Sequence, residues 1–158
     1  MSLELDLYLA IEAIRAADNG SGGFAQAGGT GLVRKWIRED DASDRDNGAF
    51  PMVRVDTSSN DEADTFEKGR ALCRGVFHVF ADRDVAYPVA SALTTGRSLD
   101  IVLKRLRTKF HRVVLTASND WTWGTLKLLR AQRAASTGKI IHRVVPFEVW
   151  ASRNSGVA

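Results

Sequence analysis

The chain has 158 residues, of which 44% are hydrophobic and 26% are charged, so it is long enough for one globular domain with a hydrophobic core. No apolar run approaches the roughly 20 residues that cross a bilayer, and the acidic start lacks the basic region of a signal peptide. The single cysteine, Cys73, argues against an intrachain disulfide or a cysteine-based metal site and fits a reducing cytoplasm, in which we expect the product to stay.

The formal net charge of +3 hides an asymmetry between the two halves of the chain. Residues 1–70 carry 8 Lys and Arg against 14 Asp and Glu, whereas residues 71–158 carry 14 against 5. Two interpretations remain open. Either opposite faces meet different partners or copies of the chain, or the fold interleaves the halves and cancels most of the field.

Residues 2–17 have the pattern of an amphipathic helix. Ser2 is placed to cap its N-terminus, and Gly20 is expected to end it by adopting the left-handed conformation. The apolar residues recur every three or four positions and therefore share one face. They are Leu3, Leu7, Ile11 and Ile14.

A glycine-rich segment follows at residues 19–31 and holds six glycines. No Lys-Ser or Lys-Thr pair ends it, so it lacks the pattern of a phosphate-binding loop, and we expect a flexible connector. Residues 32–38 then predict a strand with Trp36 and Ile37 as its bulky members.

Two further strands are predicted at residues 50–55 and 70–82. Both alternating faces of the second strand are substantially apolar, so we expect it to be central and covered on both sides, at least in an assembly. Gly75 within it indicates a bulge or a close approach of another chain segment.

Acidic loops separate these strands, at residues 39–48 and 56–67. The first contains five carboxylates, which invites a calcium site, but it lacks the central glycine and terminal glutamate of an EF-hand loop. A solvated turn is the better interpretation of this loop.

A helix is predicted from about Ala86, weakened at Gly96 and capped again by Ser98. From Ser98 onward the chain has its strongest amphipathic pattern, with basic residues mostly outside the apolar stripe. The stripe consists of Leu99, Val102, Leu103, Leu106 and Phe110.

The remaining chain predicts strands. Residues 113–116 indicate a short edge strand, and residues 121–133 alternate with a slip of register near Gly124. We expect this segment to form a hairpin with the strand at 141–149, in which Pro146 indicates an edge position or a bulge.

Together these elements predict a single α+β domain over residues 1–158, with a polar tail at 152–158. We expect a mixed or antiparallel sheet of about four to five strands, with the N-terminal helix and a second helix packed on one face.

Nothing in the sequence has the pattern of an active site. The three histidines, His78, His111 and His142, fall on separate predicted elements, and no Gly-x-Ser-x-Gly motif is present. The acidic residues lie in predicted loops, where solvent leaves them unsuited to general acid catalysis. We therefore expect no enzymatic activity, no metal and no cofactor.

Basic and aromatic residues late in the chain have the composition of an interaction surface. Tryptophans are enriched in interface hot spots and also stack on nucleic-acid bases, and a place in the core explains them equally well. Arg and Lys side chains contact phosphates or an acidic partner. The candidate interface residues are Trp121, Trp123, Arg105, Arg107, Lys127 and Arg130.

The order of elements resembles the tail completion, or tail terminator, family of tailed bacteriophages and gene transfer agents. The resemblance covers nearly the whole chain. It depends on the N-terminal helix, the strand Phe50-Pro51-Met52-Val53-Arg54-Val55, the strand core from Gly75 to Ala81, and a helix after Asp82-Arg83-Asp84. The acidic loops and the long C-terminal hairpin depart from the compact family pattern.

This resemblance implies a virion protein, made in the bacterial cytoplasm, that forms a ring, usually a hexamer, on the tail tube. The ring ends tube polymerisation and joins the neck or head connector, while DNA passes through its lumen without sequence-specific binding. Acidic residues are expected to line that lumen. The candidates are Asp40, Asp41, Asp44, Asp61, Glu62 and Asp64. The alternatives are a small nucleic-acid-binding α+β domain and another neck component, such as a stopper.

Overall fold

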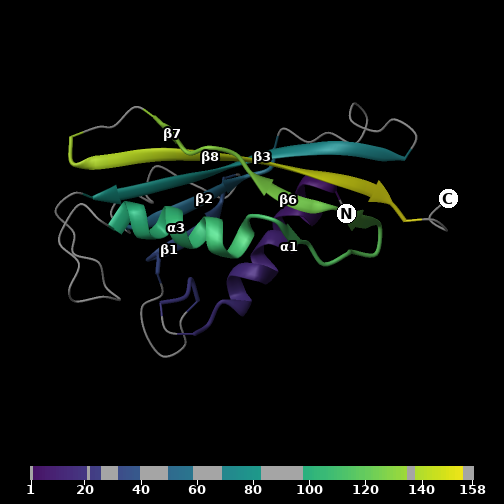
Figure 1. The fold of residues 1–158 in the computed structure, drawn as a ribbon, viewed down its shortest axis with the longest axis horizontal. Coiled ribbons are helices and arrows are strands. Elements are labelled where there is room, and N and C mark those ends of the chain that lie inside the picture. Colours follow the sequence, from purple (N-terminus) through teal and green to yellow (C-terminus); the bar gives the residue numbers. More distant parts are fainter. Residues whose placement is uncertain are drawn as a thin grey trace.

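A computed structural model of the chain describes residues 2–20, 22–25, 32–39, 50–58, 69–82, 98–134 and 138–154. Two helices and eight strands form this part of the chain, and both helices lie on one side of the sheet (Figure 1). The helices are α1 (Leu3–Ala17) and α3 (Ser98–Phe110), and the strands are β1 (Lys35–Arg38), β2 (Met52–Asp56), β3 (Arg70–Asp82), β4 (Val113–Val114), β5 (Trp121–Trp123), β6 (Thr125–Leu128), β7 (Gln132–Arg133) and β8 (Ile140–Arg153). The predicted α+β class is confirmed.

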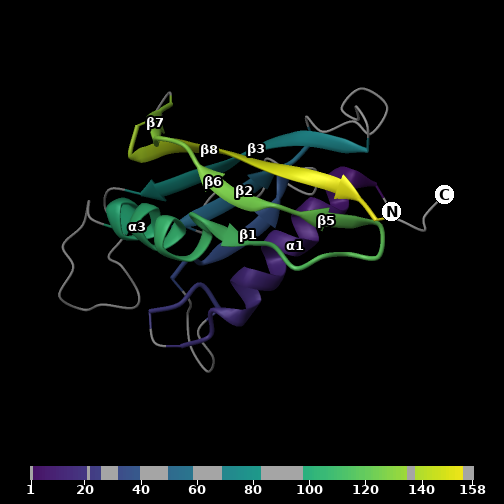
Figure 2. The same cartoon turned by 45° about the vertical axis from the view of Figure 1, so that its right-hand side comes forward.

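The sheet has the order β1-β2-β3-β8-β6-β4. β1 runs parallel to β2, and the other pairs are antiparallel, so the sheet is mixed. β3 and β8 form its long centre, with registered pairs from Arg70 opposite Ser152 to Asp82 opposite Ile140. On its other side β8 pairs in turn with β5, β6 and β7, as Figure 2 shows.

The expectation of four to five strands was wrong: eight are described, and the segment after Asp120 alone divides into three short strands. Trp123 lies opposite Ala151, but Lys127 lies opposite Glu148, so the register slips by one residue beside Gly124, as predicted. A second interruption at 129–131 separates β6 from β7. Pro146 of β8 faces that interruption, and its carbonyl accepts a hydrogen bond from the Leu129 amide at 2.8 Å. It therefore lies beside a bulge, in an interior strand.

α1 begins and ends where the sequence predicts, but the structure at its C-terminal end differs. The Ser2 hydroxyl accepts a hydrogen bond from the Leu5 amide at 3.3 Å and so caps the helix. At the other end the C-cap is Asp18, whose amide donates to the Arg15 carbonyl at 3.1 Å. The expected left-handed Gly20 was wrong: among the described residues 18–20 and 22–25, the positive φ belongs to Gly22, at 75°.

The core lies between the helices and the inner face of the sheet. Alternate residues of β3, from Ala71 to Ala81, are buried on this face, and α3 adds its predicted apolar stripe. Five aromatic rings pack in contact there, with centroid distances between 4.9 and 6.1 Å. They belong to Phe24, Trp36, Phe77, Phe110 and Phe147.

Gly75 permits a close approach at the centre of this core, as its place in the strand suggested. A Cβ there would lie 2.3 Å from Cζ of Phe147 and 2.7 Å from the Asp56 carbonyl oxygen. Both distances are too short for any side chain. The glycine thus allows β2 and the Phe147 ring to pack directly against β3.

The opposite face of the sheet is open by comparison. Leu72, Val76 and Phe80 of β3 are half-buried, and Arg74 is exposed. Both described helices pack on the inner face. The expected cover on the outer face of β3 therefore stays a prediction, which requires a partner in an assembly. Residues 40–48 of the predicted acidic loop at 39–48, residues 59–67 of the loop at 56–67 and residues 86–97 of the predicted helix lie outside the described residues.

Candidate assembly surfaces

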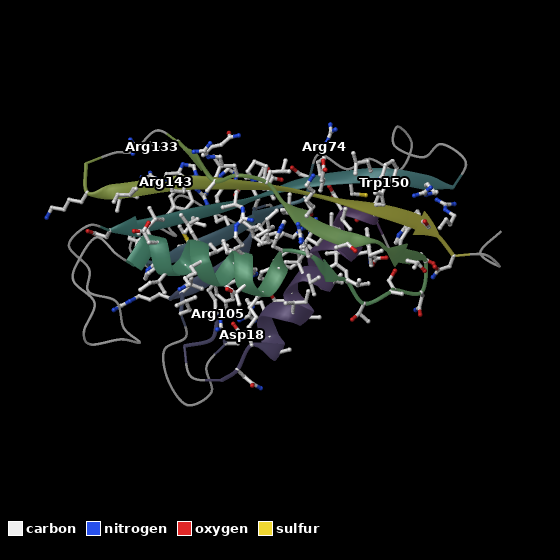
Figure 3. All side chains as sticks on the ribbon, viewed as in Figure 1. Asp18, Arg74, Arg105, Arg133, Arg143 and Trp150 are labelled. Carbon is white, nitrogen blue, oxygen red and sulfur yellow. The ribbon has the colours of Figure 1, made fainter. Side chains whose placement is uncertain are left out.

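The outer face of the sheet is formed by residues of β3 and β8 that alternate with the buried core. Trp150 of β8 is 49% exposed, although both of its neighbours, Val149 and Ala151, are buried. The Arg70 guanidinium of β3 lies 5.0 Å from the centroid of the Trp150 ring, in a cation–π contact (Figure 3 labels Trp150). A large aromatic ring beside an arginine has the composition of an interface hot spot.

Farther along this outer face, two histidines meet across β3 and β8. Nδ1 of His78 and Nε2 of His142 lie 3.0 Å apart, and the ring of Phe80 stacks on His142 with centroids 4.2 Å apart. The Arg54 guanidinium lies over the same Phe80 ring, 4.5 Å from its centroid. Register on a sheet, which sequence spacing does not reveal, is what brings the two histidines together.

Burial and, after it, the nearby charges of His78, Arg54 and Arg143 together lower the pKa of His142 to about 4. Burial likewise lowers the pKa of His78, against the opposing influence of Glu39 and Asp56. Both rings are therefore neutral near pH 7, and one donates a hydrogen bond to the other.

A groove runs on the helix side of the molecule, between α1 and the loop from Thr116 to Asn119. It encloses about 350 Å³. Its apolar wall is made by Leu9, which is 43% exposed, together with Ala10 and Ala13. We call this feature the α1 groove.

Asp6 contributes a nearly buried carboxylate to the α1 groove. The residue is 6% exposed, and its Oδ2 accepts a hydrogen bond from the Ser118 hydroxyl at 3.1 Å. No Lys or Arg in the described part of the chain forms an ion pair with it. A carboxylate so removed from water favours a cationic partner.

A second acidic residue, Asp18, joins the two helices. Its carboxylate forms a bidentate ion pair with Arg105 of α3, lies 3.5 Å from Nζ of Lys109, and accepts a hydrogen bond from the Phe24 amide at 2.9 Å. Burial raises the pKa of this carboxyl, but the hydrogen bonds and charges of these partners outweigh it, so the pKa lies below its usual range. Figure 3 shows Asp18 and Arg105 together on the helix side.

The structure separates the six predicted interface residues. Trp121 and Trp123 are buried in the core of the chain, at 2% and 3% exposed. Arg105 is engaged by Asp18. Arg107, Lys127 and Arg130 are exposed on α3, on β6 and just after β6. The six predicted lumen residues lie outside the described residues.

Two of the predicted basic residues, Arg107 and Lys127, lie near His111 together with Arg112. Nδ1 of His111 accepts a hydrogen bond from the Leu128 amide at 3.1 Å. Desolvation lowers the pKa of His111, and the charges of Arg107, Arg112 and Lys127 lower it further, which marks a local cluster of positive charge. Across the whole chain, 22 Lys and Arg stand against 19 Asp and Glu. Residues 40–49 and 59–68 contain eight acidic and two basic residues.

Features of other functional classes are few in the described residues. No three His, Cys, Asp or Glu side chains gather there in an arrangement that could hold a metal ion. Cys73 is a buried free thiol, and burial raises its pKa to about 11. Among the described helices, none has the length and apolar character needed to span a bilayer.

Comparisons with known proteins give one informative likeness. No protein-family profile matches the chain, and no curated protein sequence matches it. Among solved structures, the fold is similar to a chain of the structure titled "Virion of native gene transfer agent (GTA) particle". The two chains share 16% sequence identity and a TM-score of 0.54, over 97% of this chain and 96% of the other. At this identity the likeness shows a common fold.

Four features were not predicted: the Trp150–Arg70 pair, Asp6 in its groove, the Asp18–Arg105 ion pair and the facing histidines. Only the first left a signal in the sequence. The alternation of the strand buries Val145, Phe147, Val149 and Ala151. Trp150 falls on the opposite, outer face, where a large apolar residue is unexpected. The other three depend on contacts between distant elements.

Proposed function

We propose that the chain is a structural protein of a phage-like or gene-transfer-agent virion. The observation that carries this proposal is the fold similarity to a chain of such a virion, because it extends over nearly the full length of both chains. The molecule's own features support it, because an open outer face and a groove on the opposite side offer surfaces for contact.

Within the virion, we assign the chain to a ring that caps the tail tube, ends its polymerisation and joins the neck or head connector. A closed ring needs head-to-tail contacts, in which each subunit presents two unlike and complementary surfaces. The outer face and the α1 groove are two such surfaces, and they lie on opposite sides of the sheet. The role is one of assembly, without turnover of a substrate.

Removal of the gene from the producing cell tests this function. We expect particles without the chain to have unattached tails or tail tubes of irregular length, because nothing stops the addition of tube subunits. Electron micrographs give the tube lengths, and mass spectrometry of purified wild-type particles detects the chain. Normal attached tails of uniform length in the deletion, or absence of the chain from wild-type particles, would contradict the proposal.

Binding of nucleic acid is the second candidate, favoured by the excess of 14 Lys and Arg over 5 Asp and Glu in residues 71–158. The burial of Trp121 and Trp123 argues against it, since it removes the predicted base-stacking platform. Fluorescence anisotropy with labelled DNA separates the two functions. A ring protein binds weakly at physiological salt, whereas a DNA-binding domain shows affinity that falls steeply as salt rises.

A further inference from the structure

The Trp150–Arg70 pair projects from the outer face and has no cover in the described chain. Trp150 is the most exposed large aromatic side chain of the described residues, and Arg70 at its side is exposed as well. The Arg70 guanidinium lies over the Trp150 ring. The other arginines near acidic groups are already engaged: Arg15 with Glu12, Arg38 with Glu4, Arg54 with Glu39, and Arg105 with Asp18.

The α1 groove has the converse properties. It is a hollow of about 350 Å³ with small alanine side chains at its wall, and such a volume is about ten times the ~30 Å³ that one water occupies. The nearly buried carboxylate of Asp6 lines it and has no ion-pair partner among the described cations. An aromatic ring with a guanidinium beside it is complementary to this groove in shape, polarity and charge.

We propose that the Trp150–Arg70 pair of one copy docks in the α1 groove of the next copy, with Arg70 forming an ion pair with Asp6 across the interface. This inference builds on the proposed assembly function and names the contact between its subunits. The indole packs against Leu9, Ala10 and Ala13, which removes apolar surface from water, and the guanidinium meets a carboxylate that is already desolvated.

The position of the two features explains why such contacts propagate instead of closing as a two-fold dimer. Trp150 belongs to the outer face, while α1 packs on the inner face of the same sheet (Figures 1 and 3). A contact between unlike surfaces on opposite sides leaves one copy of a bound pair with a free groove and the other copy with a free Trp150–Arg70 pair, which we call the knob. Such head-to-tail contacts close into a ring when the rotation between neighbours allows it.

Two variants that each block one surface test the contact. Ala13→Trp fills the groove from an exposed helix position, and Trp150→Ala removes the knob from an exposed strand position, so neither threatens the core. We expect each variant alone to be monomeric by light scattering after size-exclusion chromatography. An equimolar mixture is expected to give dimers and nothing larger, because one intact knob then meets one intact groove.

The ion pair has its own variant. Asp6→Asn keeps the shape of the side chain and removes the charge, and we expect it to raise the protein concentration needed for assembly by about tenfold. Ala16→Trp, on an exposed part of α1 outside the groove, and Val114→Ala, at a residue that is 66% exposed, are matched controls that should assemble as the wild type does. Circular dichroism confirms that all variants are folded.

The outcomes separate this contact from the function on which it depends. Wild-type oligomers whose assembly is unchanged by Ala13→Trp and Trp150→Ala overturn the docking contact and leave the assembly function standing. Two monomeric variants whose mixture forms no dimers also overturn the contact. A wild-type chain that is monomeric and absent from particles overturns both.

Discussion

The two faces of β3 differ although they belong to the same strand. On the inner face Phe77 and Val79 are fully buried against α3 and β8, whereas on the outer face Val76, His78 and Phe80 keep part of their surface in contact with solvent. The inner face is closed by this chain's own helices. The comparison teaches that one strand here serves two purposes, since one side holds the fold together and the other is available to a partner.

The largest expected effect comes from truncating an aromatic ring on the inner face. Phe77→Ala removes a ring that contacts Trp36, Phe110 and Phe147, and should lower the free energy of unfolding by about 3–5 kcal/mol. Phe80→Ala on the outer face is the matched control, with an expected loss of about 1 kcal/mol. Urea denaturation followed by tryptophan fluorescence measures both. Equal losses would show that the two faces are equally closed.

A methyl group at Gly75 tests how tightly the inner face of β3 is packed. Gly75→Ala places a Cβ 2.7 Å from the Asp56 carbonyl oxygen and 2.3 Å from the Phe147 ring, and should cost about 1–3 kcal/mol. Gly124→Ala is the control, because its Cβ would lie 3.5 Å from the nearest atoms of Trp150 and should change stability by about 0.5 kcal/mol or less. A tolerated Gly75→Ala would mean that β2 and β3 pack more loosely than described.

The ion pair between Asp18 and Arg105, which joins the two helices on the inner side of the sheet, should have a comparable effect on stability. Asp18→Asn removes the charge that Arg105 and Lys109 share, and we expect a loss of about 1–3 kcal/mol of stability at pH 7. Glu12→Gln, which breaks a more exposed pair with Arg15 on α1, should cost about 0.5 kcal/mol or less. Thermal unfolding of the two variants distinguishes these values. Equal effects would contradict a structural role for Asp18.

The smallest effect is expected from acid acting on the outer face. Because the folded chain lowers the pKa of His78 and His142 below the ordinary 6.5, the unfolded chain takes up protons first as the pH falls. Stability should therefore decline between about pH 6.5 and pH 4, and the variant His142→Gln should show a shallower decline. Val114→Ala, at an exposed residue that carries no titratable group, is the control. An unchanged pH profile in His142→Gln would exclude the pair as the cause.

The sequence predicted those elements whose pattern is local. Both described helices, the strand at 70–82 and the slip at Gly124 follow from periodicity, capping and glycine placement over a few residues. The end of α1 at Ala17 agrees with the prediction, but its cap was misjudged: the C-cap is Asp18, which Arg105 of the other helix holds, and Gly20 is not left-handed.

The surfaces were harder to predict, because each combines residues that are distant in the chain. Asp6 meets Ser118, and Arg70 meets Trp150, only after the sheet has formed. Trp121 and Trp123 have the composition of an interface, but strand β5 turns both toward the core. Composition therefore indicated that interaction surfaces exist, and tertiary packing decides which residues form them.

The most direct test of the assembly account is the mass of the purified full-length chain in solution, whose single copy weighs 17.3 kDa. Light scattering after size-exclusion chromatography, with negative-stain images of the same fraction, measures mass and shape together. The account predicts one discrete oligomer that appears as a ring. A species of single-chain mass at every concentration, with no rings in the images, would contradict it.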